Sequence, residues 1–361
     1  MKKLVKVLSV LFVLGFSQSI VAGAETAVWT DKTSYSDITS QYAELAENVP
    51  VFSEELRVSS DVLKSPYQLP AATIANLTTT ELAEVVLAYP YLSDIYAYNS
   101  LQEGLEAIRK TYLPLDLLLK RTDAPVGLLE VYQSASQELG TKKARRFNMK
   151  LELLEVILAQ KELSGERDEI TAVYSQVLDN KDPGIYGESL TSYLDALAEQ
   201  KITPYASDTT TTVKTPKGSN VSVIKYGSDL TDAKKTEINN SMAKNYPKAS
   251  RLTSATKLFN CHSYAWYSSN TSTNKYWMND PAKYMSDGSY KKQTGFKSGQ
   301  KLLWADKSHS GIISMVYQGP PAPGNNAMSM VKVKSKWGQA GVYEHAGNYS
   351  PYTNNLGTAW Q

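Results

Sequence analysis

Cys261 is the only cysteine in this chain of 361 residues, and it lies in the string Asn-Cys-His-Ser-Tyr-Ala-Trp-Tyr. A single cysteine cannot form a disulfide within a monomer, so it is a buried apolar residue, an intermolecular link or a reactive thiol. Thiol catalysis requires a base that takes the proton of the sulfur and a further group that holds this base in place. The flanking residues favour the third interpretation, and we predict that Cys261 is a nucleophile.

The base must come from the three histidines of the chain, His262, His309 and His345. Adjacent residues on a helix point in different directions, so His262 is poorly placed to face the sulfur. His309 begins the string His-Ser-Gly-Ile-Ile ahead of an apolar strand, and we predict that it is the base. His345 ends Gly-Val-Tyr-Glu-His and is predicted to orient the base, with Ser335 as the alternative for this role.

The residues that follow Cys261 are expected to form a helix as far as residue 268. Unpaired amides and aligned peptide dipoles at a helix N-terminus favour a negative charge. This position is therefore expected to promote the thiolate of Cys261. A backbone amide at or beside the cysteine is also expected to face the oxyanion that develops on a substrate carbonyl.

The first half of the chain is rich in Leu, Ala and Glu, and its apolar residues recur at helical spacing. The strings Thr-Thr-Thr-Glu from residue 78 and Ser-Leu-Gln-Glu from residue 100 have capping-box spacing, which predicts helix starts. Further apolar stripes predict helices near residues 128, 154, 173 and 194. These helices carry no group that chemistry would need, so we expect a packing or docking module.

From about residue 203 the composition shifts to Tyr, Ser, Asn, Thr, Lys and Gly. Apolar patterning predicts strands at 219–225, 301–304, 311–317, 328–334 and 341–345, and a helix at 231–245. A helix followed by antiparallel strands is typical of an α+β fold. We predict a signal peptide at 1–24, a helical domain at 25–202, a linker at 203–218 and a second domain at 219–361.

The first residues have the features of an export signal, because three lysines precede an apolar stretch and Ala22-Gly23-Ala24 is a small-residue cleavage site. The formal charge is +2, and removing these three lysines leaves −1, which argues against nucleic acid as a partner. No later stretch reaches the ~18 apolar residues that a membrane span needs. The sequence predicts a secreted protein, extracellular or associated with the cell wall.

Three strings of the second half resemble the papain-like cysteine hydrolases of the NlpC and CHAP type, which act on cell walls. Asn260-Cys261 matches the cysteine element, and His309-Ser-Gly-Ile-Ile matches the histidine element. Residues 298–304 match the strand entry, with Gln300 where the family usually has Asp. His262 stands where the NlpC type usually has serine, and residues 317–327 form an insertion rich in Pro, Gly and Asn.

This resemblance covers residues 215–361 and implies a papain-like domain with an antiparallel sheet. It implies a nucleophile at Cys261, a base at His309 and a third polar residue on a following strand, for which we prefer His345 to Ser335. The implied reaction is hydrolysis of an amide or peptide bond in peptidoglycan or a peptide substrate. It would need no metal or other cofactor.

Aromatic side chains near the cysteine are candidate substrate contacts. Tyr264 and Trp266 belong to an aromatic run that lines either a sugar or peptide groove or simply the core. Trp337 lies in Lys-Ser-Lys-Trp-Gly, which fits either contact with an anionic wall polymer or a solvated strand end.

The residues leave three alternatives open. The same thioester would serve a transacylase or transglutaminase, in which an amine replaces water as the acceptor. Alternatively, the chain is a non-enzymatic binding protein, namely an exported adhesin or inhibitor whose papain-like domain is inactive. Cys261, His262 and a third histidine would otherwise hold zinc, although their spacing matches no zinc motif.

Overall fold

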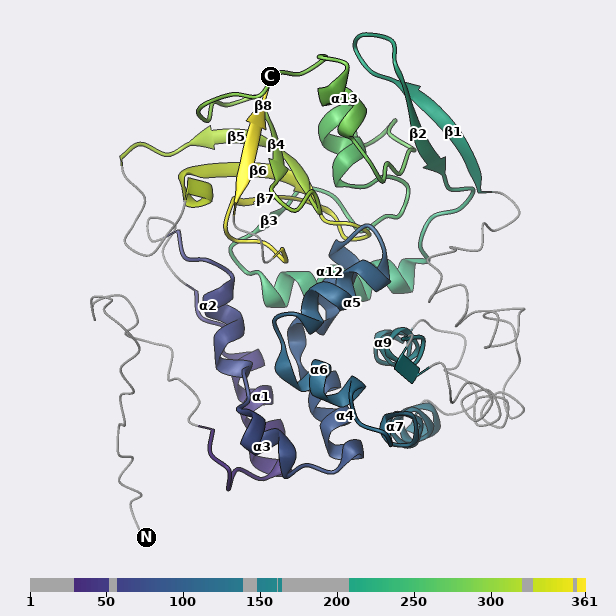
Figure 1. The fold of residues 1–361 in the computed structure, drawn as a ribbon, viewed down its shortest axis with the longest axis vertical. Helices are drawn as coiled ribbons and strands as arrows, with labels where there is room; N and C mark the ends of the chain where they lie inside the picture. Colours follow the sequence, from purple (N-terminus) through teal and green to yellow (C-terminus); the bar gives the residue numbers. More distant parts are fainter. Residues whose placement is uncertain are drawn as a thin grey trace.

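The structure is a computed structural model that describes residues 29–51, 57–138, 148–160, 162–163, 208–319, 327–352 and 356–361. Helices dominate the first part of the chain and antiparallel strands the last part, which confirms the α+β class. In Figure 1 the helical part lies at the bottom and the sheet at the top, with helix α12 between them. The predicted signal peptide lies outside the described residues.

The helical part consists of short helices with polar starts. Both predicted starts are confirmed: the Thr78 hydroxyl accepts from the Glu81 amide, and the Ser100 hydroxyl accepts from the Glu103 amide. The helices predicted near residues 173 and 194 lie outside the described residues. The elements are α1 (Tyr35–Glu47), α2 (Asp61–Lys64), η2 (Ser65–Tyr67), α3 (Ala71–Ala75), α4 (Thr79–Ala88), η3 (Pro90–Ala97), α5 (Leu101–Arg109), α6 (Leu113–Leu119), α7 (Ala124–Glu138) and α9 (Met149–Leu158).

The last part contains a β-hairpin and one larger antiparallel sheet. Strands β1 and β2 form the hairpin, and the other six strands are ordered β3-β7-β6-β5-β4-β8. Thr231 caps α12, as the helix predicted at 231–245 requires. The elements are β1 (Thr209–Lys214), β2 (Asn220–Lys225), α12 (Asp232–Asn245), β3 (Ser250–Arg251), η5 (Ser263–Tyr267), α13 (Ala282–Ser286), β4 (Lys301–Trp304), β5 (Ser310–Val316), η6 (Ala327–Met330), β6 (Val331–Lys336), β7 (Val342–Ala346) and β8 (Gly357–Trp360).

Two predicted boundaries differ from the structure. Residues 209–214, expected to belong to a linker, form strand β1 and pair with β2. Their polarity suits a loop, but β-branched Thr also suits a strand, and Val213 buries its side chain opposite Val221. The strand predicted at 328–334 begins later, because residues 327–330 form η6 and β6 starts at Val331.

One apolar core runs through both parts of the chain. The ring of Tyr246, at the end of α12, lies 5.8 Å from Tyr91 of η3 and 5.2 Å from Trp337 after β6. A buried ion pair joins Lys64 of α2 to Asp94 of η3 at 2.8 Å, and Asp94 also accepts from the Tyr246 hydroxyl. The helices and the sheet therefore share an interior, and a functional site can draw side chains from both.

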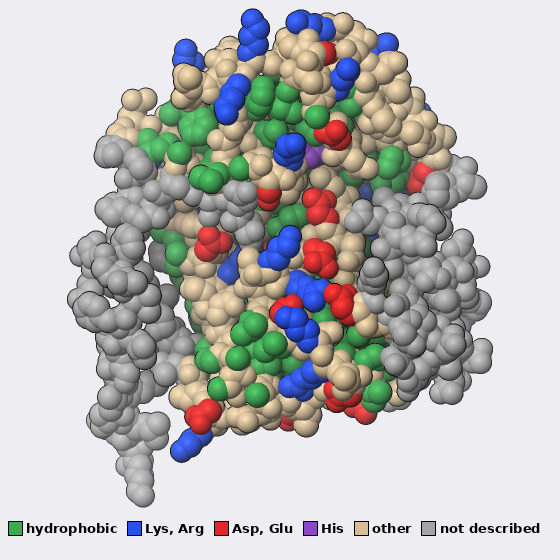
Figure 2. All heavy atoms as spheres, viewed as in Figure 1, with side chains coloured by type: hydrophobic (Ala, Val, Ile, Leu, Met, Phe, Trp, Pro, Cys, Tyr) green, Lys and Arg blue, Asp and Glu red, His purple; other side chains and the backbone are tan. Residues whose placement is uncertain are grey.

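The surface carries charges of both signs. Figure 2 shows Lys and Arg interspersed with Asp and Glu on one face, and cations gather at the top of this view, over the sheet. This distribution fits the small net charge of the chain. Within the described ranges, no helix combines the length and the apolarity that a membrane crossing requires.

Candidate active site

Asn260 places Cys261 at the first position of a short helical turn that continues into η5. The Asn260 side-chain oxygen accepts from the Ser263 amide at 3.1 Å, as a helix cap does, and from the Met278 amide at 3.0 Å. Its amide nitrogen donates to the Met278 carbonyl at 2.7 Å. These bonds explain why a polar residue precedes the cysteine, since they fix both the turn and the segment at Met278.

The sulfur of Cys261 is buried, with 1% of the residue exposed. Burial raises the pKa of this thiol to about 12, while the backbone amides of Ser310 and His262 act in the opposite direction. The His262 amide at the helix start favours the thiolate, as expected, but loss of solvent outweighs it. At neutral pH the thiol is protonated.

Strand β5 brings His309 into the same region of the core, because the Ser310 amide that follows it interacts with the Cys261 sulfur. The His309 ring stacks on Tyr352 with centroids 3.7 Å apart, and it meets the edge of Trp304 at 4.5 Å. Neither ring nitrogen of this fully buried histidine has a hydrogen-bond partner in the described part of the chain. Burial lowers the pKa of His309 well below its usual range, so the ring is neutral.

His345 and Ser335, the two candidates for the third role, are hydrogen-bonded to each other on strands β7 and β6. The Ser335 hydroxyl lies 2.8 Å from Nε2 of His345, and Nδ1 lies 2.7 Å from the Ala346 carbonyl. Because a carbonyl only accepts, Nδ1 carries the proton and Nε2 accepts from Ser335. Burial lowers the pKa of His345 to about 4. The described contacts do not bond this pair to His309, so its orienting role stays a prediction.

His262 contacts Ser310 and Asn99. Its Nδ1 lies 2.8 Å from the Ser310 hydroxyl, which also accepts from the Trp266 indole at 2.9 Å. Its Nε2 lies 3.4 Å from the side-chain nitrogen of Asn99. Burial lowers the pKa of His262 to about 4. The ring therefore positions β5 against the cysteine turn.

Asn99, between η3 and α5, is a site residue that the sequence analysis missed. Its side-chain oxygen accepts from the side-chain nitrogen of Asn260 at 2.8 Å and lies 3.7 Å from the Cys261 sulfur. The carboxylate of Glu103 accepts from the backbone amides of Asn99 and Ser100, which fixes this turn. No local pattern around residue 99 indicates such a contact, because its partners lie more than 160 residues further along the chain.

No protein-family model, curated protein or solved structure matches this chain. The site must therefore be interpreted from its own chemistry. A thiol, a neutral imidazole with unused nitrogens and two amides that point at the sulfur are the groups that acyl transfer through a thioester needs.

Lys336, in the string considered for binding an anionic polymer, is buried instead. Its ammonium donates to the carbonyls of Thr256, at 2.9 Å, and Gly338. Burial lowers the pKa of Lys336 to about 7. The positive charge of Lys336 and a negative charge on the Cys261 sulfur stabilise each other. A cation in the interior therefore favours ionisation of the thiol.

The three aromatic residues predicted to contact substrate lie in the interior. Tyr264 is 6% exposed, Trp266 2% and Trp337 0%. Trp266 packs against Tyr290, and Trp337 stacks on Tyr343 with centroids 4.0 Å apart. Contact of these rings with a substrate stays a prediction.

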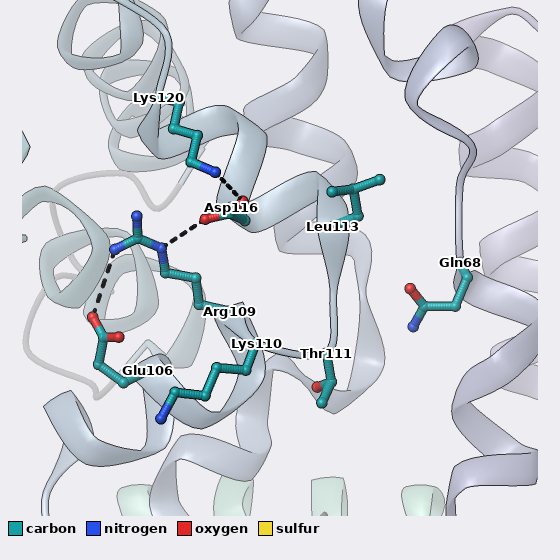
Figure 3. Close-up of a pocket in the computed structure, with 8 residues that line it drawn as sticks. All are labelled: Gln68, Glu106, Arg109, Lys110, Thr111, Leu113, Asp116 and Lys120. Carbon is teal, nitrogen blue, oxygen red and sulfur yellow. Dashed lines mark hydrogen bonds and ion pairs between the residues drawn. The ribbon is translucent and has the colours of Figure 1, made fainter.

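Two surface cavities occur away from the cysteine. One, of about 470 Å³, lies between α5 and α6, where Arg109 bonds Asp116 at 3.0 Å and Lys120 bonds Asp116 at 2.6 Å (Figure 3). Arg109, Asp116 and Lys120 therefore pair with one another within the cavity wall. The other, of about 250 Å³, is lined by β2 and residues 277–283. Cys261 and the three histidines line neither of them.

Metal binding finds no support in the described ranges. No group of three or more His, Cys, Asp or Glu side chains there is arranged to hold an ion. The ring nitrogens of His262 and His345 face hydroxyl, amide and carbonyl groups instead. Among the described residues, Cys261 and His262 therefore lack the third ligand that a zinc site requires.

Proposed function

We propose that the protein is a secreted cysteine hydrolase that cleaves an amide or peptide bond in peptidoglycan. Cys261 is the nucleophile and His309 the base. One observation carries the proposal. Among the residues that the structure describes, neither nitrogen of the buried His309 ring has a hydrogen-bond partner, and the backbone amide of the next residue, Ser310, bonds the sulfur of Cys261. Buried polar atoms are almost always paired, and catalytic groups are a recognised exception.

The chemistry follows from these groups. His309 takes the thiol proton, and the Cys261 sulfur attacks the substrate carbonyl to form a tetrahedral adduct. The protonated ring then gives its proton to the leaving amine. Departure of this amine leaves the acyl group bound to the sulfur as a thioester. Water, activated by the same ring, attacks the thioester and releases the carboxylic acid and the free thiol.

His309 is in the neutral form that a general base requires, because burial lowers the pKa of its ring well below the usual range. The same burial weakens the ring as a base, and neither ring nitrogen bonds the thiol in the described part of the chain. Transfer of the thiol proton to His309 therefore requires the site to rearrange. The amides of Ser310 and His262 and the Lys336 ammonium favour negative charge on the sulfur. We assign the orienting role to His345, which we prefer to Ser335 as the third residue that the sequence resemblance implies.

Release of soluble fragments from purified cell walls tests the proposal. Cys261→Ala and His309→Gln should each lower the rate at least ~10³-fold, because each removes a group that acts in the bond-breaking step. His345→Gln should lower it by ~10- to 100-fold. His262→Gln is the matched histidine control and should change the rate less than ~10-fold. Equal activity of Cys261→Ala and the parent chain would sink the proposal.

The products decide between the acceptors. Hydrolysis leaves a free carboxylic acid, whereas added hydroxylamine traps a thioester as a hydroxamate. A chain that prefers amines to water even at low amine concentration is a transacylase.

A further inference from the structure

Every candidate catalytic side chain is covered in this structure. Cys261 is 1% exposed, His309 0% and His345 1%. A substrate carbonyl must approach the sulfur to bonding distance, so the arrangement described cannot accept a substrate without movement. The identity of the covering residues therefore decides how the site is reached.

Three consecutive residues of the helical part, Ala97, Tyr98 and Asn99, provide this cover. We call them the 97–99 segment. The Asn99 side chain lies against the Cys261 sulfur at 3.7 Å. The Ala97 carbonyl accepts from the hydroxyl of Tyr352, at 2.5 Å, and the Tyr352 ring stacks on His309. The segment thus acts on both halves of the proposed catalytic pair.

Tyr98 reinforces the same arrangement. Its ring meets Tyr352 edge-on with centroids 5.1 Å apart, and it is 5% exposed. Tyr352 is therefore held between the 97–99 segment and the His309 ring. None of these contacts gives a hydrogen bond to the ring nitrogens of His309. The cover therefore closes the site and leaves both nitrogens without a partner among the described residues.

Hydrogen bonds hold Asn99 from both sides. On the sulfur side its side-chain oxygen accepts from the Asn260 side-chain nitrogen at 2.8 Å and from the Cys261 thiol at 3.7 Å, and its side-chain nitrogen lies 3.4 Å from Nε2 of His262. In the helical part, the Glu103 carboxylate accepts from the Asn99 backbone amide, and the nearby Tyr96 carbonyl accepts from the Gln339 backbone amide at 2.7 Å.

Asn99 itself is partly exposed, whereas Cys261 beneath it is buried. Asn99 therefore contacts the sulfur and is itself in contact with solvent. Removing or rotating its side chain would open a path to the thiol without unfolding the shared core.

We propose that the 97–99 segment is an autoinhibitory cover that keeps the Cys261 thiol and the His309 ring inaccessible until the segment moves. The inhibitory role of the cover rests on the proposed function. The test of the cover does not, because it measures only the accessibility of the thiol. The helical part thereby acts as a built-in inhibitor of the site in the same chain. Movement of the segment exposes the sulfur and releases the Tyr352 ring from His309.

Alkylation of the folded full-length chain by iodoacetamide at pH 8 tests the cover, and Cys261 is the only thiol that can react. Asn99→Gly removes the covering side chain and should raise the alkylation rate at least ~10-fold. Asn99→Leu keeps a side chain of similar size without its hydrogen bonds, and its alkylation should stay slow.

Glu103→Ala supplies a second, independent opening, because it removes the carboxylate that anchors the Asn99 amide. Its matched control is Glu81→Ala, which removes the equivalent capping carboxylate of α4. Glu103→Ala should raise the rate at least ~10-fold, and Glu81→Ala should change it less than ~2-fold. Circular dichroism at the labelling temperature confirms that each variant is folded.

Two results would overturn the cover. One is alkylation of the parent chain at the rate of a free cysteine, and the other is an equal rise in Glu81→Ala and Glu103→Ala. Cell-wall hydrolysis by Asn99→Gly is measured separately and should exceed that of the parent chain. Fast alkylation without hydrolysis would leave the cover standing and reject the proposed function.

Discussion

The side-chain oxygen of Asn99 lies 3.7 Å from the sulfur of Cys261, although 162 positions separate the two residues in the chain. This contact places a residue of the helical part directly on the proposed nucleophile. The helical part is therefore more than a separate docking module, because it shares both the core and the site with the strands.

Burial of the thiol predicts an unusual pH dependence of its alkylation. With a pKa of about 12, the folded chain should react ~10-fold faster for each pH unit from pH 8 to 11. In urea the same thiol should reach its plateau just above its ordinary pKa near 9. Because only the unfolded chain ionises between these values, this group should also lower stability as pH rises from about 9 to 12. A plateau below pH 9 in the folded chain would contradict the buried state.

The buried histidines predict loss of stability in acid. Burial lowers the pKa of His345 to about 4, so between about pH 6.5 and 4 the unfolded chain binds a proton that the folded chain does not. Stability should therefore fall as pH falls through this window, by about 1–2 kcal/mol from this residue between pH 7 and 5. His345→Gln should reduce the pH dependence of urea unfolding by that amount. An unchanged pH dependence would show that His345 has the same pKa in the folded and the unfolded chain.

Gly338 lies where the last part of the chain meets the helical part, and we expect any side chain at this position to lower the free energy of unfolding. It has a positive φ of 44°, and an added Cβ would lie 2.4 Å from the Tyr96 carbonyl oxygen. Gly338→Ala should destabilise the chain by about 2–4 kcal/mol through strain and overpacking. Gly218→Ala, at φ 86° with open space around it, isolates the strain and should cost about 1 kcal/mol. Urea unfolding measures both, and equal values would argue against close packing at Tyr96.

The buried pair Lys64–Asp94 predicts a large effect of breaking one partner. Burial raises the pKa of Asp94 even beside the Lys64 ammonium. Lys64→Met would leave this carboxyl in the core without its cation and should cost about 3–5 kcal/mol. Lys120→Met breaks the exposed pair with Asp116 and should cost less than about 1 kcal/mol. Chemical denaturation of both variants checks the difference, and equal losses would mean that Asp94 is solvated.

Local signals were readable from the sequence because they act over a few residues. The helix starts at Thr78 and Ser100 were predictable from a hydroxyl and a carboxylate three positions apart, and the structure has both caps. The strand after His309 and the helix that carries Met242 followed from apolar spacing in the same way. The Thr-rich start of β1 escaped detection because only its pairing with β2 makes it a strand.

The sequence by itself determined which groups are available for chemistry: one thiol, three imidazoles and the polar turn around Asn260. Only the tertiary structure decided their state. Desolvation of Cys261, the stacking of Tyr352 on His309 and the approach of Asn99 all arise between segments far apart in the chain. Such contacts depend on how the helices and the sheet pack around a common core, so no pattern within one segment can specify them.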